Sequence, residues 1–310
     1  MLRLVTWNVR YFSHSTRGIT SMDHTQRAIS AAIASMRPQP DVVALQEIDD
    51  ASFRSLAFRA RGRTKRGESV SNFDRFYDSL NRQSLEIGGH QYQAQFYPAQ
   101  GHRGGTPLYS TGLALLWRSG LTLVDHNGHE PHDITHRRIA RLARFKQKRI
   151  CAWGRFRAQS GEEVDVFNTH LSLPAFFQRT NGPTGGRFGE SDNQLREIDS
   201  LLEFVAQNGQ LDRTLLVGDF NALPGSRVYN RVTSTFRDAH ATFLGAPPAR
   251  MVELPSAGFM NLRYRLDHVF SGPALRFHDF QDTAPYGPAH PWAPLSDHAP
   301  LVGRFSVAAP

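Results

Sequence analysis

The sequence of 310 residues contains little cysteine and no long apolar run, and these absences exclude several classes of protein. Its single cysteine, Cys151, rules out an internal disulfide framework. Because no run of about 18 apolar residues occurs, the sequence predicts no membrane-spanning helix. The first residues enter a strand-like pattern without the apolar core of a signal peptide, so we expect a cytoplasmic protein. Internal repeats and low-complexity linkers are also missing, which favours a single domain over residues 1–310.

Apolar and basic residues are abundant. Apolar types make up 40% of the chain and include 21 phenylalanines, enough for a large folded core. Lysine and arginine number 36 against 28 acidic residues, which gives a net charge of +8. The excess is concentrated in two segments without acids, with six basic residues in 54–66 and nine in 136–157. Such segments attract phosphate-bearing polyanions or an acidic membrane surface, although they also occur as solvated basic faces.

Apolar strand-like runs alternate with amphipathic helical segments, a pattern that predicts a layered α/β fold. The chain opens with a strand at 2–9, a helix at 25–36 and a buried strand at 41–48. Further strands are expected at 112–117, 121–124, 149–157, 163–171, 215–219, 266–270 and after 300, with helices at 73–85, 191–208 and 228–233. We interpret the region around 51–107 as a basic insert that shapes substrate entry, and 244–261 as loop.

The stretch from Leu215 to Pro224 carries polar residues at the end of an apolar run, and other strand-like runs end in polar residues of the same kinds. An apolar run delivers Asp219 and Asn221 to the end of a strand, just before a Pro-Gly turn. The period of two in a strand would point both side chains to one face, although such residues also serve ordinary turns. Five other strand-like runs end in, or contain, polar residues of the same kinds: Asn8, Glu47, Asn168 with His170, Asp267, and Asp297 with His298. Six such coincidences favour a shared site.

A histidine-rich segment offers a competing site. Four histidines fall within eleven residues of one another: His126, His129, His132 and His136. Their spacing suggests zinc, but Gly128 and Pro131 prevent the helix that would align them. Since no cysteine or acid completes a ligand set, a polar loop is the favoured interpretation.

The polar strand ends, taken in chain order, resemble the motifs of the endonuclease/exonuclease/phosphatase superfamily, which comprises deoxyribonuclease-like, metal-dependent phosphoesterases. The matching segments are Thr6–Arg10, Leu45–Glu47, Asn168–Leu171, Gly218–Asn221, Arg265–Val269 and Ser296–Pro300. The resemblance spans nearly the whole chain, and Gly218–Asn221 and Ser296–Pro300 are its most specific parts. It implies a four-layer α/β sandwich, with two central, mostly antiparallel sheets flanked by helices and an active site at one rim.

The resemblance also implies a divalent metal, Mg²⁺ or Mn²⁺, since hard oxygen ligands suit these ions and one or two carboxylates suffice. Glu47 is the first candidate ligand, with Asn8 and Asp297 nearby. Asp219 and Asn221 would complete this set or form a second one.

For the reaction itself, the resemblance makes Asp267 the residue that orients His298 as the general base, with Asp219 a rival for activating water. His170 would bind a non-bridging phosphate oxygen or act as the general acid. We expect the substrate phosphate to be contacted by Arg10, Asn168 and Asn221.

Two departures from the family pattern narrow the function. Members that repair abasic sites usually carry an acid where this chain has Arg10, and a tyrosine where it has His170. Both positions look more like pancreatic-type deoxyribonucleases, sphingomyelinases and inositol phosphatases, so abasic-site repair is disfavoured.

Three functions follow from these patterns. The leading expectation is a nuclease acting on DNA or RNA, with nucleic acid as partner. The alternative is a phosphatase or phospholipase C-like hydrolase, which would act at an anionic membrane or on a phosphorylated small molecule such as an inositol phosphate. A third reading, a non-catalytic binding module, is opposed by the complete set of acids, amides and histidines.

Overall fold

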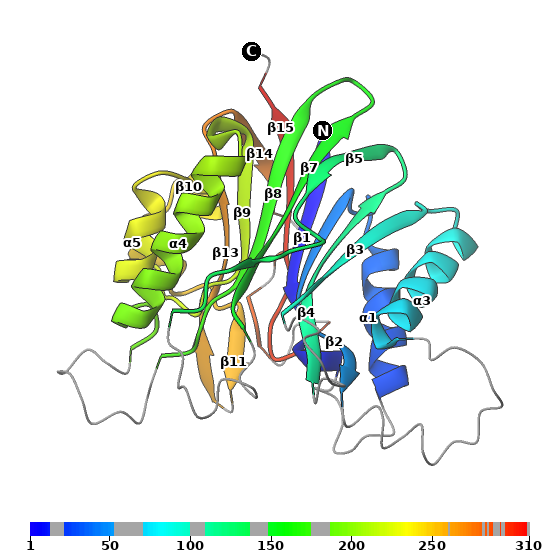
Figure 1. Cartoon of the computed structure of the whole chain (residues 1–310), viewed down its shortest axis with the longest axis horizontal. Helices are drawn as coiled ribbons and strands as arrows, with labels where there is room; N and C mark the ends of the chain where they lie inside the picture. Colours follow the sequence, from blue (N-terminus) through cyan, green and yellow to red (C-terminus); the bar gives the residue numbers. More distant parts are fainter. Residues whose placement is uncertain are drawn as a thin grey trace.

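The structure is a computed structural model. It describes residues 1–12, 22–52, 71–99, 109–136, 148–174, 187–259, 261–280, 283, 285–287, 292 and 295–308. Two β-sheets face one another at the centre of the molecule, and helices cover their outer faces (Figure 1). This arrangement is the predicted four-layer α/β sandwich.

The first sheet has six strands. In spatial order they are β14 (Leu275–Asp279), β15 (Leu301–Val307), β1 (Leu2–Asn8), β2 (Val42–Ser52), β4 (Tyr109–Arg118) and β3 (Tyr92–Pro98). Strands β1 and β2 run parallel, and the other neighbours in this sheet are antiparallel.

The second sheet has seven strands. In spatial order they are β10 (Arg237–Asp238), β13 (Asp267–Ser271), β9 (Thr214–Asp219), β8 (Glu163–His170), β7 (Ile150–Ala158) and β5 (Leu121–His126), while β6 (His132–Asp133) pairs with β7. Only β8 and β9 are parallel among these pairs. A small separate ribbon consists of β11 (Ala257–Phe259) and β12 (Leu262–Tyr264).

The helices form the two outer layers. On one side lie α1 (Met22–Ser35) and α3 (Asn72–Glu86), and on the other α4 (Asp192–Asn208) and α5 (Arg227–Thr233). Shorter segments are η1 (Arg10–Phe12), η3 (Leu211–Arg213), α6 (Ala239–Leu244) and α7 (Pro248–Met251). None of the helices in the described ranges is long and apolar enough to cross a membrane.

Three apolar clusters join these layers. One lies between the sheets and includes Leu4, Ala44, Leu115 and Val217. The second packs α1 and α3 on the first sheet, and the third packs α4 and α5 on the second sheet. Burial of apolar area at roughly 25 cal/mol per Å² makes these clusters the main source of stability.

Within the region 51–107, where we expected a basic insert, residues 71–98 form a helix and a strand of the sandwich. A capping box between Ser71 and Asp74 starts α3, and its buried face carries Phe73, Phe76 and Leu80. Strand β3 pairs with β4 along its whole length and forms an edge of the first sheet. The basic residues of 54–66 and most of those in 136–157 lie outside the described residues. The 244–261 region, expected to be loop, holds α7 and β11.

Candidate active site

The polar strand ends converge at one end of the sandwich, opposite the chain termini (Figure 1). Strands β1, β8 and β9 end there with Asn8, His170 and Asp219. Strand β13 begins there with Asp267, and His298 lies three residues before β15. Two sheets that pack face to face thus bring together residues up to 290 positions apart.

Glu47 reaches this rim because β2 is irregular at that point. The pairing of β2 with β4 shifts between Leu45 and Ile48, which marks a β-bulge. Within the bulge Glu47 has a φ of 54°, in the left-handed region that residues other than glycine seldom adopt. Such local strain occurs where the surrounding structure holds a side chain in a functional direction.

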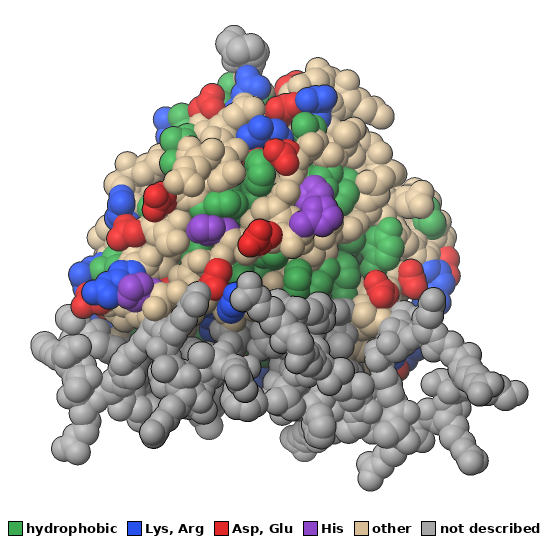
Figure 2. Space-filling model, in the orientation of Figure 1, with side chains coloured by type: hydrophobic (Ala, Val, Ile, Leu, Met, Phe, Trp, Pro, Cys, Tyr) green, Lys and Arg blue, Asp and Glu red, His purple; other side chains and the backbone are tan. Residues whose placement is uncertain are grey.

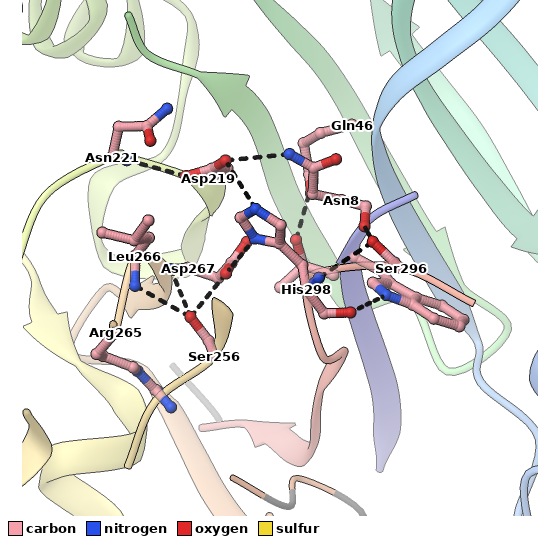
Figure 3. Close-up of polar contacts among 12 residues, drawn as sticks. Asn8, Gln46, Asp219, Asn221, Ser256, Arg265, Leu266, Asp267, Ser296 and His298 are labelled. Carbon is pink, nitrogen blue, oxygen red and sulfur yellow. Dashed lines mark hydrogen bonds and ion pairs between the residues drawn. The ribbon is translucent and has the colours of Figure 1, made fainter. Parts of the chain in front are cut away.

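Asn8 joins the two sheets through its side-chain amide. Its Nδ2 donates to Glu47 Oε1 at 3.2 Å and to Asp219 Oδ2 at 3.0 Å. Its Oδ1 accepts from the backbone N–H of Arg10 at 3.0 Å. Two carboxylates from different sheets therefore lie around one neutral amide, and Figure 3 shows the bond from Asn8 to Asp219.

His298 and Asp267 form a hydrogen-bonded pair. His298 Nδ1 lies 2.8 Å from Asp267 Oδ2, and its Nε2 lies 3.8 Å from Asp219 Oδ2 (Figure 3). Burial lowers the pKa of His298, but Asp267 and Asp219 outweigh burial and raise it to about 10. The two carboxylates therefore favour the protonated imidazole at neutral pH.

Ser256 supports that pair, and no sequence motif pointed to it. Its hydroxyl donates to Asp267 Oδ2 at 2.7 Å and accepts the backbone N–H groups of Leu266 and Asp267 at 3.0 Å each. The hydrogen bond from Ser256 holds the Asp267 carboxylate in place, and the carboxylate in turn holds the His298 imidazole. A lone serine in an irregular segment gives no sequence signal, because only tertiary contacts bring it to Asp267.

Asp219 and Asn221 are joined by a turn. Strand β9 ends at Asp219, and Asn221 has a φ of 47°, so the alternation of a strand does not extend to Asn221. Asp219 Oδ1 instead accepts the backbone N–H of Asn221 at 3.0 Å, as in an Asx-turn (Figure 3). Burial chiefly, with Asp267 and Glu47 adding to it, raises the pKa of Asp219 to about 7.

His170 lies between the two carboxylates. Its Nε2 is 3.5 Å from Asp219 Oδ2 and 3.7 Å from Glu47 Oε1, while its buried Nδ1 has no hydrogen-bond partner. Burial, together with the nearby Arg149 and His298, holds the pKa of His170 well below its usual range. The ring is therefore neutral, and it can present an N–H on the side of the carboxylates.

The donor set fits a hard divalent cation. Burial raises the pKa of Glu47 as it does that of Asp219, so both carboxylates lack full charge compensation. A cation that prefers carboxylate oxygens would supply that compensation. Asn8 faces both carboxylates with its Nδ2, so it could join the ligand set only through Oδ1. Another close cluster of ligand atoms, within 4.8 Å of one another, consists of Asp219, Asp267 and His298. In that cluster, however, Asp267 and His298 already bind each other.

The remaining predicted site residues have partners within the protein. Asp297 Oδ2 lies 3.0 Å from Arg10 Nη1, at the edge of the site. Asn221 Nδ2 donates to Leu171 O at 3.0 Å. Asn168 is fully buried: its Nδ2 donates to two carbonyl oxygens of the first sheet, and its Oδ1 accepts from Gln46 Nε2 at 2.7 Å. Both amide hydrogens of Asn168 are thus used, which leaves no donor for a phosphate and corrects that expectation.

Arg149 is a basic residue of the site that the motifs did not identify. It lines a small cavity with His170, and its Nη1 is buried without a hydrogen-bond partner. It also acts electrostatically on the pKa values of Tyr11 and Glu47. The only sequence signal for it was its place in the basic 136–157 segment.

The four histidines at 126–136 do not form a metal cluster in the described part of the chain. His132 stacks on Phe204 with ring centroids 4.3 Å apart, and His136 Nε2 lies 2.6 Å from Arg196 Nη1. Two of these histidines lie in strands, His126 at the end of β5 and His132 in β6, so the segment is not wholly the polar loop that was expected.

Comparison with solved structures places the sandwich in a known fold class. An endonuclease/exonuclease/phosphatase from Bacteroides vulgatus has a TM-score of 0.60 at 14% identity, over 99% of this chain and 98% of that one. The human Nocturnin catalytic domain with bound sulfate gives 0.57 at 19% identity, over 99% and 94%. ANGEL2, a 2',3'-cyclic phosphatase, gives 0.59 at 14% identity, over 98% and 94%. These similarities establish the fold.

The sequence itself identifies the family. A model of the Endonuclease/Exonuclease/phosphatase family matches residues 5–298, which include five of the six strand-end motifs in full and the last one as far as His298. The chain belongs to this family, whose members are hydrolytic phosphoesterases that generally use divalent metals. Comparison with curated proteins gives no significant match.

Proposed function

We propose that this protein is a divalent-metal-dependent phosphodiesterase, and that it acts as a nuclease on DNA or RNA. The observation that carries the proposal is the juxtaposition of the buried Asp219 carboxylate and the partly buried Glu47 carboxylate around Asn8, with the Asp267–His298 pair beside them. Phosphodiester hydrolysis needs a cation for the phosphate and a base for the water, and these groups can hold one and provide the other.

In the proposed reaction Glu47 would be the first ligand of the metal, with Asp297 and Asp219 as further carboxylates. Asn8 would contribute its Oδ1, which accepts the Arg10 N–H in the structure. A bound Mg²⁺ or Mn²⁺ would neutralise charge on the phosphate oxygens. Asp219 takes the proton of the attacking water, since a base with a pKa of about 7 is well matched to neutral pH. As the water oxygen bonds to phosphorus, the bond to the leaving oxygen breaks, and the leaving oxygen takes a proton from solvent. His298, held by Asp267, stabilises the negative charge on the phosphate.

His170 donates a hydrogen bond to a non-bridging phosphate oxygen. Because its pKa is lowered, the ring is not protonated at neutral pH and has no acidic proton for a leaving oxygen, which favours the binding role over that of general acid. Arg10, Arg149 and the second amide hydrogen of Asn221 add donors around the phosphate.

Charge and fold relatives support nucleic acid as the substrate. The net charge of +8 favours polyanions. ANGEL2, which shares the fold, is a 2',3'-cyclic phosphatase, and such a phosphate ends a nucleotide chain. On the coloured part of the face in Figure 2, acidic and basic side chains are interspersed. We therefore assign substrate binding to the rim where the polar strand ends converge.

A substrate panel tests the proposal. Plasmid DNA, single-stranded DNA, RNA, a 2',3'-cyclic nucleotide, sphingomyelin, inositol phosphates and bis-p-nitrophenyl phosphate are each incubated with Mg²⁺, Mn²⁺ or chelator. We expect cleavage of nucleic acid that needs metal and disappears in Asp219→Ala and His298→Ala. Matched controls are Asp192→Ala and His278→Ala, which alter exposed partners of Arg227 and Ser306.

The other outcomes are equally informative. Hydrolysis of lipid or inositol phosphate alone would move the substrate to the phosphatase or phospholipase class. Binding of nucleic acid without hydrolysis of any phosphoester, under any metal, would make the protein a binding module and reject the enzymatic proposal.

A further inference from the structure

Strands β8 and β9 carry the two central site residues to the rim in parallel register, and the last matched residues are His170 and Asp219. Just beyond them, Leu171 N–H donates to Asp219 O at 2.9 Å, and Asn221 Nδ2 donates to Leu171 O at 3.0 Å. Because β9 stops and Asn221 turns into the left-handed region, the regular ladder ends here. The relative position of the two segments must then be fixed by other groups.

Gln194, in the first turn of α4, lies across this point. Its Nε2 donates to Ser172 O at 2.8 Å and to Asn221 O at 2.9 Å. Its Oε1 accepts the N–H of Gly189 at 3.2 Å and the hydroxyl of Ser191 at 3.0 Å. The side chain is fully buried, and both amide hydrogens and the amide oxygen are occupied. The side-chain amide of Gln194 therefore connects the two segments where regular backbone hydrogen bonds between the strands have ended.

The next turn of α4 holds the same segment from a second side. The Glu197 carboxylate, also fully buried, accepts the N–H of Ser172 at 2.9 Å and its hydroxyl at 2.6 Å. Asn193 Nδ2 donates to Glu197 Oε1 at 2.7 Å. Since Ile198 and Leu201 anchor α4 in the core, these polar groups stand on a rigid base.

We propose that Gln194 is a positioning residue, which sets the separation of His170 and Asp219 by binding the loop after each strand; this rests on the proposed function. Neither motif nor mechanism includes it, and it touches neither of those two side chains. Rates fall steeply when reacting groups move by about 1 Å, so a clamp at the ends of both strands has a direct effect on turnover.

Two replacements test the clamp. Gln194→Met keeps the volume and removes every hydrogen bond, whereas Gln194→Glu keeps the shape but turns the donor toward both carbonyls into an acceptor. The matched controls, Gln207→Met and Gln207→Glu, change the same residue type on the same helix, where its Nε2 contacts only exposed Glu203 at 3.3 Å. Each variant is assayed on bis-p-nitrophenyl phosphate with Mn²⁺, and by amide hydrogen exchange in chelator.

We expect kcat to fall ~10- to 100-fold in both Gln194 variants, with KM changed by less than about 2-fold, as for other supporting residues of metal sites. In metal-free protein the amides of Leu171 and Asn221 should exchange ~10-fold faster or more, while the controls match the wild type. A merely structural residue would lower thermal stability without this localised exchange or the selective fall in kcat.

Three results would overturn the inference. The first is a kcat within about 2-fold of wild type in Gln194→Met, with unchanged exchange at the two amides. The second is a uniform rise in exchange over the whole of α4 and both sheets. The third is failure of both variants to fold, since Gln194 would then hold the fold rather than the site. An inactive wild type would instead reject the proposed function, and the exchange measurement would still decide about Gln194.

Discussion

Replacing Asp267 by asparagine tests the electrostatic reasoning about the site without relying on any substrate. Asp267 Oδ2 accepts from His298 Nδ1 at 2.8 Å and from Ser256 Oγ at 2.7 Å. The Asp267→Asn side chain has the same shape, but it lacks the charge that favours the protonated imidazole. The pKa of His298 should therefore fall.

The magnitude follows from the pKa of His298. Its rise from an ordinary value of 6.5 to about 10 corresponds to about 5 kcal/mol, at roughly 1.4 kcal/mol per unit. Asp267 is the largest of the carboxylates that raise it, so we assign about 2 kcal/mol to this residue. Because the folded-state pKa lies above the unfolded one, this stabilisation is present below pH 6.5 and is lost as the pH rises through 10.

Urea unfolding in chelator, from pH 6 to pH 10.5, measures the effect. The free energy of unfolding of the wild type should exceed that of Asp267→Asn at pH 6. This difference between the two proteins should be about 2 kcal/mol larger at pH 6 than at pH 10.5. Asp192→Asn is the control, because Asp192 pairs with Arg227 on the exposed surface and should show no such pH dependence. A difference between wild type and Asp267→Asn that stays constant over this pH range would refute the electrostatic account of the pair.

Three further predictions concern single residues. Glu47→Gln should raise the metal concentration for half-maximal rate ~10-fold or more, because it removes the proposed ligand charge; unchanged metal dependence would remove Glu47 from the ligand set. Arg149→Gln should raise KM for a phosphodiester ~5-fold or more with little change in thermal stability, and an unaltered KM would exclude contact with substrate. Gly218→Ala should destabilise by more than about 2 kcal/mol in urea unfolding, since its φ is 132° and a Cβ would lie 2.0 Å from Thr169 O. Gly161→Ala is the control, because Gly161 has a φ of 93° but an added Cβ would meet no other atom, so this variant shows the effect of backbone strain without a clash. An equal loss of unfolding free energy in both variants would contradict the steric argument.

Most of the architecture was predictable from local patterns. Periodicity located α1, α3, α4 and most strands of both sheets to within a few residues, because each must bury one apolar face, but it missed β3 and β14 at the edges of the first sheet. The short elements α7 and β11 were missed, since their few residues carry too little periodic signal. The family resemblance supplied the pairing of these elements into two sheets, which the family match supports.

The site divides in a similar way. Its acids, amides and histidines were visible as strand ends, but their hydrogen-bond partners were not. Asn168 looked equivalent to Asn8 in the sequence, yet it lies between the sheets with both amide hydrogens bound to backbone carbonyls. Ser256 and Gln194 carried no signal, because each acts on residues brought near only by folding.

The sequence by itself thus determined the residue types at the strand ends, their order along the chain and the family, since these depend on local pattern. Only the tertiary structure decided which side chains meet. Asn8 and Asp219 are 211 positions apart, and they touch because two sheets pack face to face with their strand ends at one rim. The same packing buries Asp219 and His170 and partly buries Glu47, and this burial shifts their pKa values, a physical effect that no local sequence contains.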